Sequence, residues 1–405
     1  MSDIAALSPA VASFVARAHE GEARALLKRE GLPQRRLEAW RYTPLRDIDK
    51  TGFEAPRAVS LGEAEALVAR LAPEARTGHR IVFINGAVVD ALTRLPEAVS
   101  LGGAGVPLVA DRPLSVLNAA LQQPGLMLHV PEGVEAGQIC LVSLVTSEAP
   151  VSTHLAHRVT LGAGASLTLL DIQSGEGRYL ANPSLAVTVA EGAHLTHLRV
   201  QQDAAEATNL AFVAADVAEN GTYDSFTLTL GARLSRHEVL AHLGGKHATV
   251  HVNAAQLLAG SQHADLTSVI THAAPDCNSR QTVKNVLMDA SHGVFQGKIF
   301  VDRIAQKTDG YQMNQALLLS EKAQIDSKPE LEIYADDVKC SHGATVGALD
   351  DEQLFYLRAR GIPHAEARAM LVRAFLLDAL SLVTDETAHA LLDQRVDAWW
   401  QKREG

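Results

Sequence analysis

A cysteine and a histidine, Cys340 and His342, stand two residues apart near the C-terminal end of the 405-residue chain. Residues 328–347 read as a strand, and side chains alternate across a strand, so both should point to one side, with Val338. A thiolate and an imidazole are ligands for iron, copper or zinc, whereas a closed metal site or an iron-sulfur cluster takes about four ligands. The pair therefore predicts half of a site, whose remaining ligands come from another chain.

The alternative is that Cys340 is an ordinary core residue. Free cysteine is among the most buried residue types and often packs as a small hydrophobe. The other two cysteines, Cys140 and Cys277, fall in no C-x-x-C and in no other zinc or ferredoxin spacing. Polar residues around Cys340, and a change to helical patterning from Asp350 onward, favour a site at a structural boundary.

A glycine-rich run at residues 243–247 resembles a nucleotide-binding loop only superficially. The position five before Gly245 is Leu240 rather than glycine, and neither serine nor threonine follows Lys246 directly. No G-x-G-x-x-G fingerprint follows a predicted strand and opens a helix, so the sequence gives no basis for a bound flavin. We predict that the chain does not hydrolyse ATP itself.

Histidine is frequent, and four of the 17 histidines fall close together: His237, His242, His247 and His251. On strands with turns between them they cannot share a helical face, and no H-E-x-x-H occurs. We interpret most of them as outward-facing polar strand residues. His272 and Cys277 can meet across a turn, and we interpret that pair as structural.

Composition narrows the class of protein. Apolar residues make up 47%, charged residues 20%, and the net charge is −11. An acidic chain without a basic patch is not expected to bind nucleic acid. Three cysteines argue against a disulfide framework. With no secretion signal pattern and no run of about 18 apolar residues, the sequence predicts a cytoplasmic protein that does not enter a membrane.

The pattern of the chain changes near residue 110. Residues 5–29 and 61–71 have helical spacing of apolar positions. From about Pro113 to Val346 the chain consists of short alternating or β-branched runs separated by small and turn residues, and helical patterning is nearly absent. We therefore predict three parts: a mainly helical subdomain at 1–110, a β core at 111–348 and a helical subdomain at 349–405.

The turn residues of the β core recur at intervals mostly in the mid-to-upper twenties. A repeat of that length built from strands and turns is typical of a β-helix, in which each coil rises about 4.8 Å. About nine coils would result, with a narrow interior of stacked valine, isoleucine, leucine and alanine, which agrees with an aromatic content of only 4%. Helical segments at both ends would cover the unpaired strand edges.

Three helices are predicted after the β core. The first covers residues 351–359, the second runs from His364 to Leu380 with Pro363 at its first turn, and the last covers 386–402. The second helix is apolar around more than one stripe, so it is either buried on two sides or docks a partner.

The segment with Cys340 and His342, continuing through D-D-E-Q-L-F-Y-L-R-A-R-G-I at residues 350–362, resembles the C-terminal signature of the SufB/SufD family of iron-sulfur cluster assembly proteins. R-R-L-E-A-W-R-Y-T at residues 35–43 is similar to a short N-terminal motif of the same family. The C-S-H tripeptide, its A-D-D-V-K context and the low cysteine count favour the SufD branch. The resemblance spans nearly the whole chain and implies a mainly β fold, a right-handed parallel β-helix flanked by helical subdomains.

The resemblance also implies a function. A member of this family is expected to be a non-catalytic scaffold subunit of the SUF complex, pairing with a SufB-type paralogue through the last coils. Nascent clusters would form at that interface, with Cys340 and His342 as transient ligands and no tightly bound cofactor. A SufC-type ATPase would dock on the second C-terminal helix, where we single out five residues: Met370, Leu371, Arg373, Ala374 and Phe375.

Two other classes remain open at this stage. Parallel β-helices also cleave acidic polysaccharides, but such enzymes need paired carboxylates and aromatic platforms, and an acidic chain repels an anionic polymer. A self-associating structural rod would explain the solenoid but not the segment with Cys340 and His342. An exposed terminal strand also makes a homodimer plausible when the chain is isolated.

Overall fold

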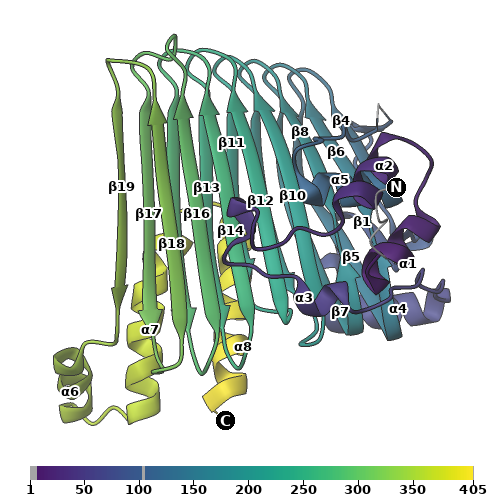
Figure 1. The fold of residues 1–405 in the computed structure, drawn as a ribbon. Helices are drawn as coiled ribbons and strands as arrows, with labels where there is room; N and C mark the ends of the chain where they lie inside the picture. The colour runs from purple at the N-terminus through teal and green to yellow at the C-terminus, as the bar shows by residue number, and fades with distance from the viewer. Residues whose placement is uncertain (1–6, 103–104, 405) are drawn as a thin grey trace.

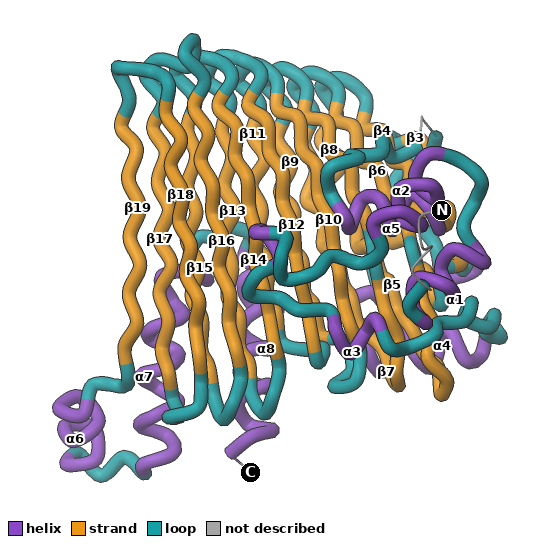
Figure 2. The backbone as a smooth tube through the Cα atoms, in the orientation of Figure 1, coloured by secondary structure: helices purple, strands orange, loops and turns teal. Residues whose placement is uncertain are grey.

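The computed structural model describes residues 7–102 and 105–404. Most of this chain is wound into a parallel β-solenoid of about eight turns, with helices at its N-terminal and C-terminal ends (Figure 1). The predicted mainly β solenoid with flanking helices is confirmed, and its length is close to the nine coils expected. Figure 2 shows the strands side by side, joined by short loops at both ends of each coil.

Two parallel layers of strands form the solenoid, and consecutive strands alternate between them. We call the layers face A and face B. Face A contains β1 (His79–Ile84), β5 (Glu135–Thr153), β7 (Ser166–Ala181), β9 (His194–Gln202), β11 (Thr222–Thr229), β13 (Thr249–Leu258), β15 (Asn278–Leu287), β17 (Asp309–Leu318) and β19 (Lys339–Gly347). Face B contains β4 (Gln123–Val130), β6 (Leu155–Leu161), β8 (Ser184–Val189), β10 (Thr208–Val217), β12 (Leu234–Leu243), β14 (His263–His272), β16 (His292–Val301) and β18 (Gln324–Ile333).

The repeat is 32 residues long between β4 and β6, where Gln123 pairs with Leu155, shortens as far as β10 and β12, and then lengthens again. Paired residues are 26 apart between β10 and β12, where Thr208 pairs with Leu234, and 32 apart between β16 and β18, where His292 pairs with Gln324. Corner residues adopt the left-handed backbone region, for example Gly192 at φ 64° and Asn220 at φ 54°. Glycine reaches this region freely and asparagine at little cost, which explains why these residue types mark the repeat.

Helices cover the outer side of each face. On face B lie α1 (Pro9–Arg17), α2 (Glu22–Glu30) and α5 (Pro113–Leu121), which pack on the outward side chains of β10 and β12. On face A lie α4 (Leu61–Leu71), α7 (His364–Leu380) and α8 (Glu386–Glu404). The outward residues beneath these helices are mostly apolar, and Lys284, buried beneath α7, is an exception.

Short elements complete the described chain. They are the 3₁₀ turns at Glu38–Trp40, Pro73–Arg76 and Asp90–Leu92, helix α3 (Arg46–Asp49), the two-residue strands β2 (Ala87–Val88) and β3 (Ser100–Leu101), and helix α6 (Asp351–Ala359). The described part of the chain contains no helix long and apolar enough to cross a bilayer.

The interior of the solenoid differs from the expected uniform aliphatic stack. The half of the interior next to the first residues of the face A strands is apolar and includes Leu169, Leu195 and Val250. The other half carries buried polar residues, among them Asp171 and Arg199, whose carboxylate and guanidinium lie 2.8 Å apart. These buried groups hydrogen-bond to one another, and Arg199 also donates to Asn209 of face B across the interior at 3.0 Å.

Several element predictions need correction. The helical pattern at residues 5–29 is two helices, α1 and α2, because the chain is extended at Ala18 and Gly21 adopts φ 147°; Ala5 and Ala6 lie outside the described residues. Residues 113–121, predicted as the start of the β core, form α5, since Pro113 suits a first helical turn. The predicted ranges 61–71, 351–359 and 364–380 match α4, α6 and α7.

Candidate functional site

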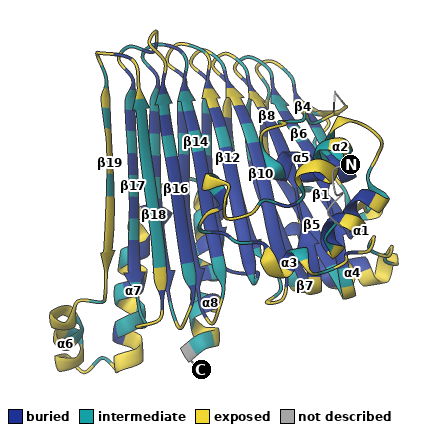
Figure 3. Cartoon of the chain, in the orientation of Figure 1, coloured by how far each residue is buried: buried dark blue, intermediate teal, exposed yellow. Residues whose placement is uncertain are grey.

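The last strand of the solenoid, β19, has a neighbour on one side only. It pairs in parallel with β17, and none of the other described strands pairs with its opposite edge. Most of its residues are exposed, as Figure 3 shows by the yellow colour of β19. An unpaired strand edge offers a row of backbone N–H and C=O groups to another strand.

The register of β19 defines which backbone groups are free. The Lys339 N–H donates to the Thr308 carbonyl at 2.8 Å, on the β17 side. In a parallel ladder, alternate residues direct both backbone groups to the same neighbour. Lys339 and every second residue after it therefore face β17, whereas Cys340, His342, Ala344 and Val346 direct their N–H groups to the open edge.

Cys340 continues the inner side of the solenoid. It pairs with Gly310, and a Cβ placed on Gly310 would lie 3.4 Å from the Cys340 Sγ, so the thiol is on the same side as the interior. It packs at the margin of a small apolar cluster with Ile299 and Val301. Burial raises the pKa of the Cys340 thiol, and nearby Asp309 raises it further, against a lowering hydrogen bond from the Gly310 backbone. The thiol form is therefore favoured at neutral pH until a metal ion or a base removes the proton.

His342 lies one step further along the same inner row. It pairs with Gln312, which is fully buried, whereas His342 itself is exposed because no coil follows it. The predicted shared side of Cys340 and His342 thus agrees with the register. The pair faces the uncovered end of the interior, where a partner strand would close it.

Among residues 7–102 and 105–404, no group of three or more histidine, cysteine, aspartate or glutamate side chains is placed to hold a metal ion. Cys340 and His342 are accordingly two donors with no third beside them in the described chain. A cluster with about four ligands needs the remainder from a second chain.

The five residues singled out in α7 fall into two groups. Met370 and Ala374 are exposed and Leu371 is half-buried. Arg373 instead reaches α8, where it lies 3.2 Å from Asp393 and 3.4 Å from Asp397. Phe375 packs on the outer side of face A, with the buried Lys284 ammonium 4.5 Å from its ring. These two residues hold α7 in place within the chain.

Sequence patterns did not single out the aromatic residues of α6. Phe355 is 73% exposed and Tyr356 is 56% exposed, and α6 buries none of its residues. Met370 and Leu377 of α7 are also exposed, at 46% and 44%. The signal was present in the sequence as two adjacent aromatic residues, Phe355 and Tyr356, in a short helix, a pattern that forms no single buried stripe.

The motif at residues 35–43 inserts two buried side chains, Trp40 and Thr43, against face B. Trp40 is 1% exposed, and its ring stacks on the Arg236 guanidinium at 4.0 Å. Arg236 donates to Glu238 at 2.7 Å and also contacts Asp265, which accepts a hydrogen bond from Thr43. The motif therefore anchors the N-terminal segment to the solenoid.

The other two cysteines and His272 have packing or hydrogen-bond partners within the chain. Cys140 is buried beneath α4, and burial raises the pKa of its thiol well above the usual value. His272 contacts Ser279 at 2.8 Å, while the Cys277 thiol donates to the Gly245 carbonyl at 3.2 Å, so each has its own partner. His237 corrects the prediction of outward-facing histidines. It is buried in the interior, where desolvation lowers its pKa well below 6.5.

Comparison with known proteins gives a consistent result. Residues 144–375 match the model of the SufBD core domain, described as SUF system FeS cluster assembly. The chain is 32% identical over 385 residues to the iron-sulfur cluster assembly protein SufD of Escherichia coli, covering 89% of this chain and 87% of that protein. It is 31% identical to an iron-sulfur cluster assembly SufBD family protein of Synechocystis, covering 87% and 85%.

Proposed function

The chain belongs to the SufBD family of SUF-system iron-sulfur cluster assembly proteins, and on that premise we propose that it is a non-catalytic scaffold subunit that binds a SufB-type paralogue through β19. The observation that carries this proposal is the open edge of β19 beside Cys340 and His342. A strand of the paralogue would add to that edge and bring further ligands beside the two residues.

The nascent cluster is the cargo of this interface rather than a resident cofactor. His342 is exposed and ligates iron through one ring nitrogen in its neutral form. Cys340 carries its proton until iron binding displaces it, so ligation of iron there releases a proton. The partner chain supplies the remaining thiolates, which accounts for a site of two donors.

The C-terminal helices are the proposed docking site of a SufC-type ATPase. Exposed apolar side chains gather on α6 and on the outer side of α7, namely Phe355, Tyr356, Met370 and Leu377, with Leu371 and Ala374 beside them. An exposed apolar set of this kind is typical of a protein contact. ATP-driven movement of the ATPase would then act on the chain close to β19, which leads directly into α6.

Native mass after co-expression tests this proposal. The tagged chain, produced in the cytoplasm with SufB-type and SufC-type proteins of its own source, is expected in a complex with one SufB-type chain and two ATPases. Purification alone, or as a homodimer with neither partner bound, would contradict the proposal and favour a self-associating rod. The polysaccharide-cleaving alternative is set aside by the family to which the chain belongs.

A further inference from the structure

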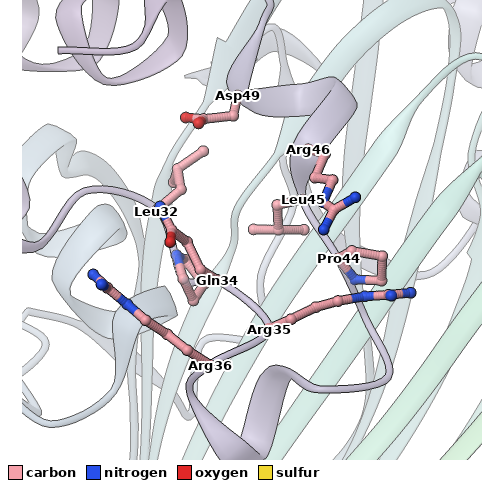
Figure 4. Close-up of a pocket in the computed structure, with 9 residues that line it drawn as sticks. Leu32, Gln34, Arg35, Arg36, Pro44, Leu45, Arg46 and Asp49 are labelled. Atoms are coloured by element: carbon pink, nitrogen blue, oxygen red, sulfur yellow. The ribbon is translucent and has the colours of Figure 1, made fainter. Parts of the chain in front are cut away.

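A surface hollow of about 400 Å³ lies between a loop and the segment that ends in α3, both near the N-terminus. It is bounded by residues 32–36 on one side and by residues 44–49 on the other, and Figure 4 shows the side chains that line it. The hollow is remote in sequence from β19 and from the C-terminal helices. A volume of this size suits a small molecule.

Three arginines line the hollow: Arg35, Arg36 and Arg46. Arg35 and Arg46 extend to the same side, with Pro44 between them, while Arg36 extends to the opposite side (Figure 4). All three side chains are exposed, and none forms an ion pair with a carboxylate among residues 7–102 and 105–404.

The neighbouring carboxylates are engaged elsewhere. Asp49, the acidic residue of the lining, accepts a hydrogen bond from the Ser8 hydroxyl. Glu38 pairs with Lys328 at 2.7 Å, and Asp47 lies 3.5 Å from both Lys50 and Arg233. Three arginines against the one carboxylate of the lining leave the hollow with a positive balance, in a chain whose net charge is −11.

The two segments that carry these arginines, residues 32–36 and 44–49, are packed against the core. Leu32 and Leu45 are buried at 6% and 3% exposure, and Pro33 and Pro44 restrict the backbone beside them. Trp40, which lies between the two segments in the sequence, stacks on the Arg236 guanidinium. The backbone of both segments is thus ordered before a ligand binds, which lowers the entropy cost of binding.

We propose that this hollow binds a small ligand with two or more oxyanion groups, either phosphates or carboxylates. Guanidinium groups form paired, charge-assisted hydrogen bonds with both kinds of oxyanion. The enclosed size favours a small molecule over a nucleic acid strand or a membrane surface. This site is independent of the proposed cluster interface, and either assignment can fail without the other.

Isothermal titration of the isolated full chain at low ionic strength tests the proposal, with pyrophosphate and citrate as probes, because exposed charges are screened by salt. Arg35→Gln and Arg46→Gln are each expected to weaken binding by about tenfold or more, the scale of one lost charge-assisted contact. Arg303→Gln is the matched control, since it removes an exposed arginine without an ion-pair partner in the described chain, on the corner between β16 and β17 and outside the lining of the hollow.

Each result decides the matter. Binding of pyrophosphate alone assigns a phosphate ligand, and binding of citrate alone assigns a carboxylate ligand. If neither probe binds at millimolar concentration, the proposal is overturned. It is also overturned if Arg303→Gln weakens binding as much as Arg35→Gln and Arg46→Gln, because the attraction would then be general charge.

Discussion

Arg236 carries a positive charge at a position where its side chain has no exposed surface. Burial alone would lower the pKa of Arg236, but the Asp265 and Glu238 carboxylates raise it above the usual value. Trp40 covers the guanidinium and is the largest fully buried side chain of the N-terminal segment. A buried ion pair is stable only when both charges keep their hydrogen-bond partners, so loss of a neighbouring side chain is costly.

Trp40→Ala should therefore destabilise the protein strongly. Truncation of a buried tryptophan costs about 3–5 kcal/mol, and here water would also reach Arg236. Urea unfolding of the purified chain measures the change. Trp40→Phe, which keeps an aromatic face over Arg236, should cost less. An equal loss for both variants would mean that the stacking contributes nothing.

The residues of the candidate site illustrate what alternation can and cannot predict. Residues two positions apart on a strand point to the same side, so the common orientation of Cys340 and His342 followed from their spacing. Alternation does not tell the inner side from the outer side when helices cover the outer one. The inward position of His237 was missed for that reason, because β12 carries apolar residues at both its inward and its outward positions.

At the scale of elements, β19 is defined by its open edge. Ala344 directs its N–H away from β17, so proline at this position removes no bond of the existing ladder. Ala344→Pro should leave the thermal midpoint of the isolated chain within a few degrees but abolish binding of the SufB-type partner, because an added strand loses its bonding partner. Ala344→Val, which keeps the N–H, is the control in a co-purification assay. Retained binding by the proline variant would place the interface elsewhere.

Helices α6 and α7 form the second exposed element. Replacing Phe355, Tyr356 and Met370 together by serine removes apolar surface that contacts solvent, so stability should change by about 1 kcal/mol or less. Binding of the SufC-type ATPase should fall by about a hundredfold or more, because exposed anchors of this kind account for most of the contact energy. Surface plasmon resonance measures the affinity of the SufC-type ATPase for the unchanged chain and for the triple variant. Leu61→Ser, at an equally exposed leucine on α4, should have no effect; an unchanged affinity of the triple variant contradicts the docking site.

Helix starts were predictable at α4 and α7, where the sequence carries a capping residue or a proline. Ser60 with Glu63 forms a capping box at the start of α4, and Pro363 precedes α7, so both starts were marked in the sequence. Helix α5 was missed because its residues are almost all buried and apolar, which hides the helical period. The break between α1 and α2 depends on backbone angles at Ala18 and Gly21 that residue patterns do not specify.

At the scale of the whole molecule, buried histidines link stability to pH. Desolvation lowers the pKa to about 3 for His154 and to about 4 for His157, His263 and His272. In the unfolded chain these groups titrate near their ordinary value of about 6.5. Their folded pKa is depressed, so the associated stability is fully present above pH 6.5 and is lost as the pH falls toward 4.

The free energy of unfolding should therefore drop steeply between pH of about 6.5 and 4, by up to about 1.4 kcal/mol per pH unit for each such histidine. Asp171 contributes only at the acid end of this window, because an unfolded aspartate begins to bind protons near about pH 5. Burial would raise its pKa, but Arg199 and His197 hold it well below the usual range. Urea titrations across this range measure the slope. His272→Gln should flatten it, whereas His242→Gln, at an exposed histidine, should not; a slope that is the same in all three proteins contradicts the assignment.

The polar interior was the other feature that the sequence did not predict. Low aromatic content and β-branched strands indicated a narrow core, and the apolar side of the interior agrees with that. Asp171, Arg199 and Gln201 sit at inward positions of strands whose outward positions are apolar, so the strand pattern reads equally well with the two sides exchanged. Only the helices packed on face A resolve the ambiguity.

The most direct test of the account is cluster formation in the co-expressed complex with His342→Ala. We measure native mass, iron and acid-labile sulfide content, and visible absorption, with Lys339→Ala as the control at an exposed residue of the same strand. The account predicts an intact complex that has lost most of its cluster, while the control keeps both. A normal cluster yield in the His342→Ala complex would contradict cluster assembly at the open end of the solenoid.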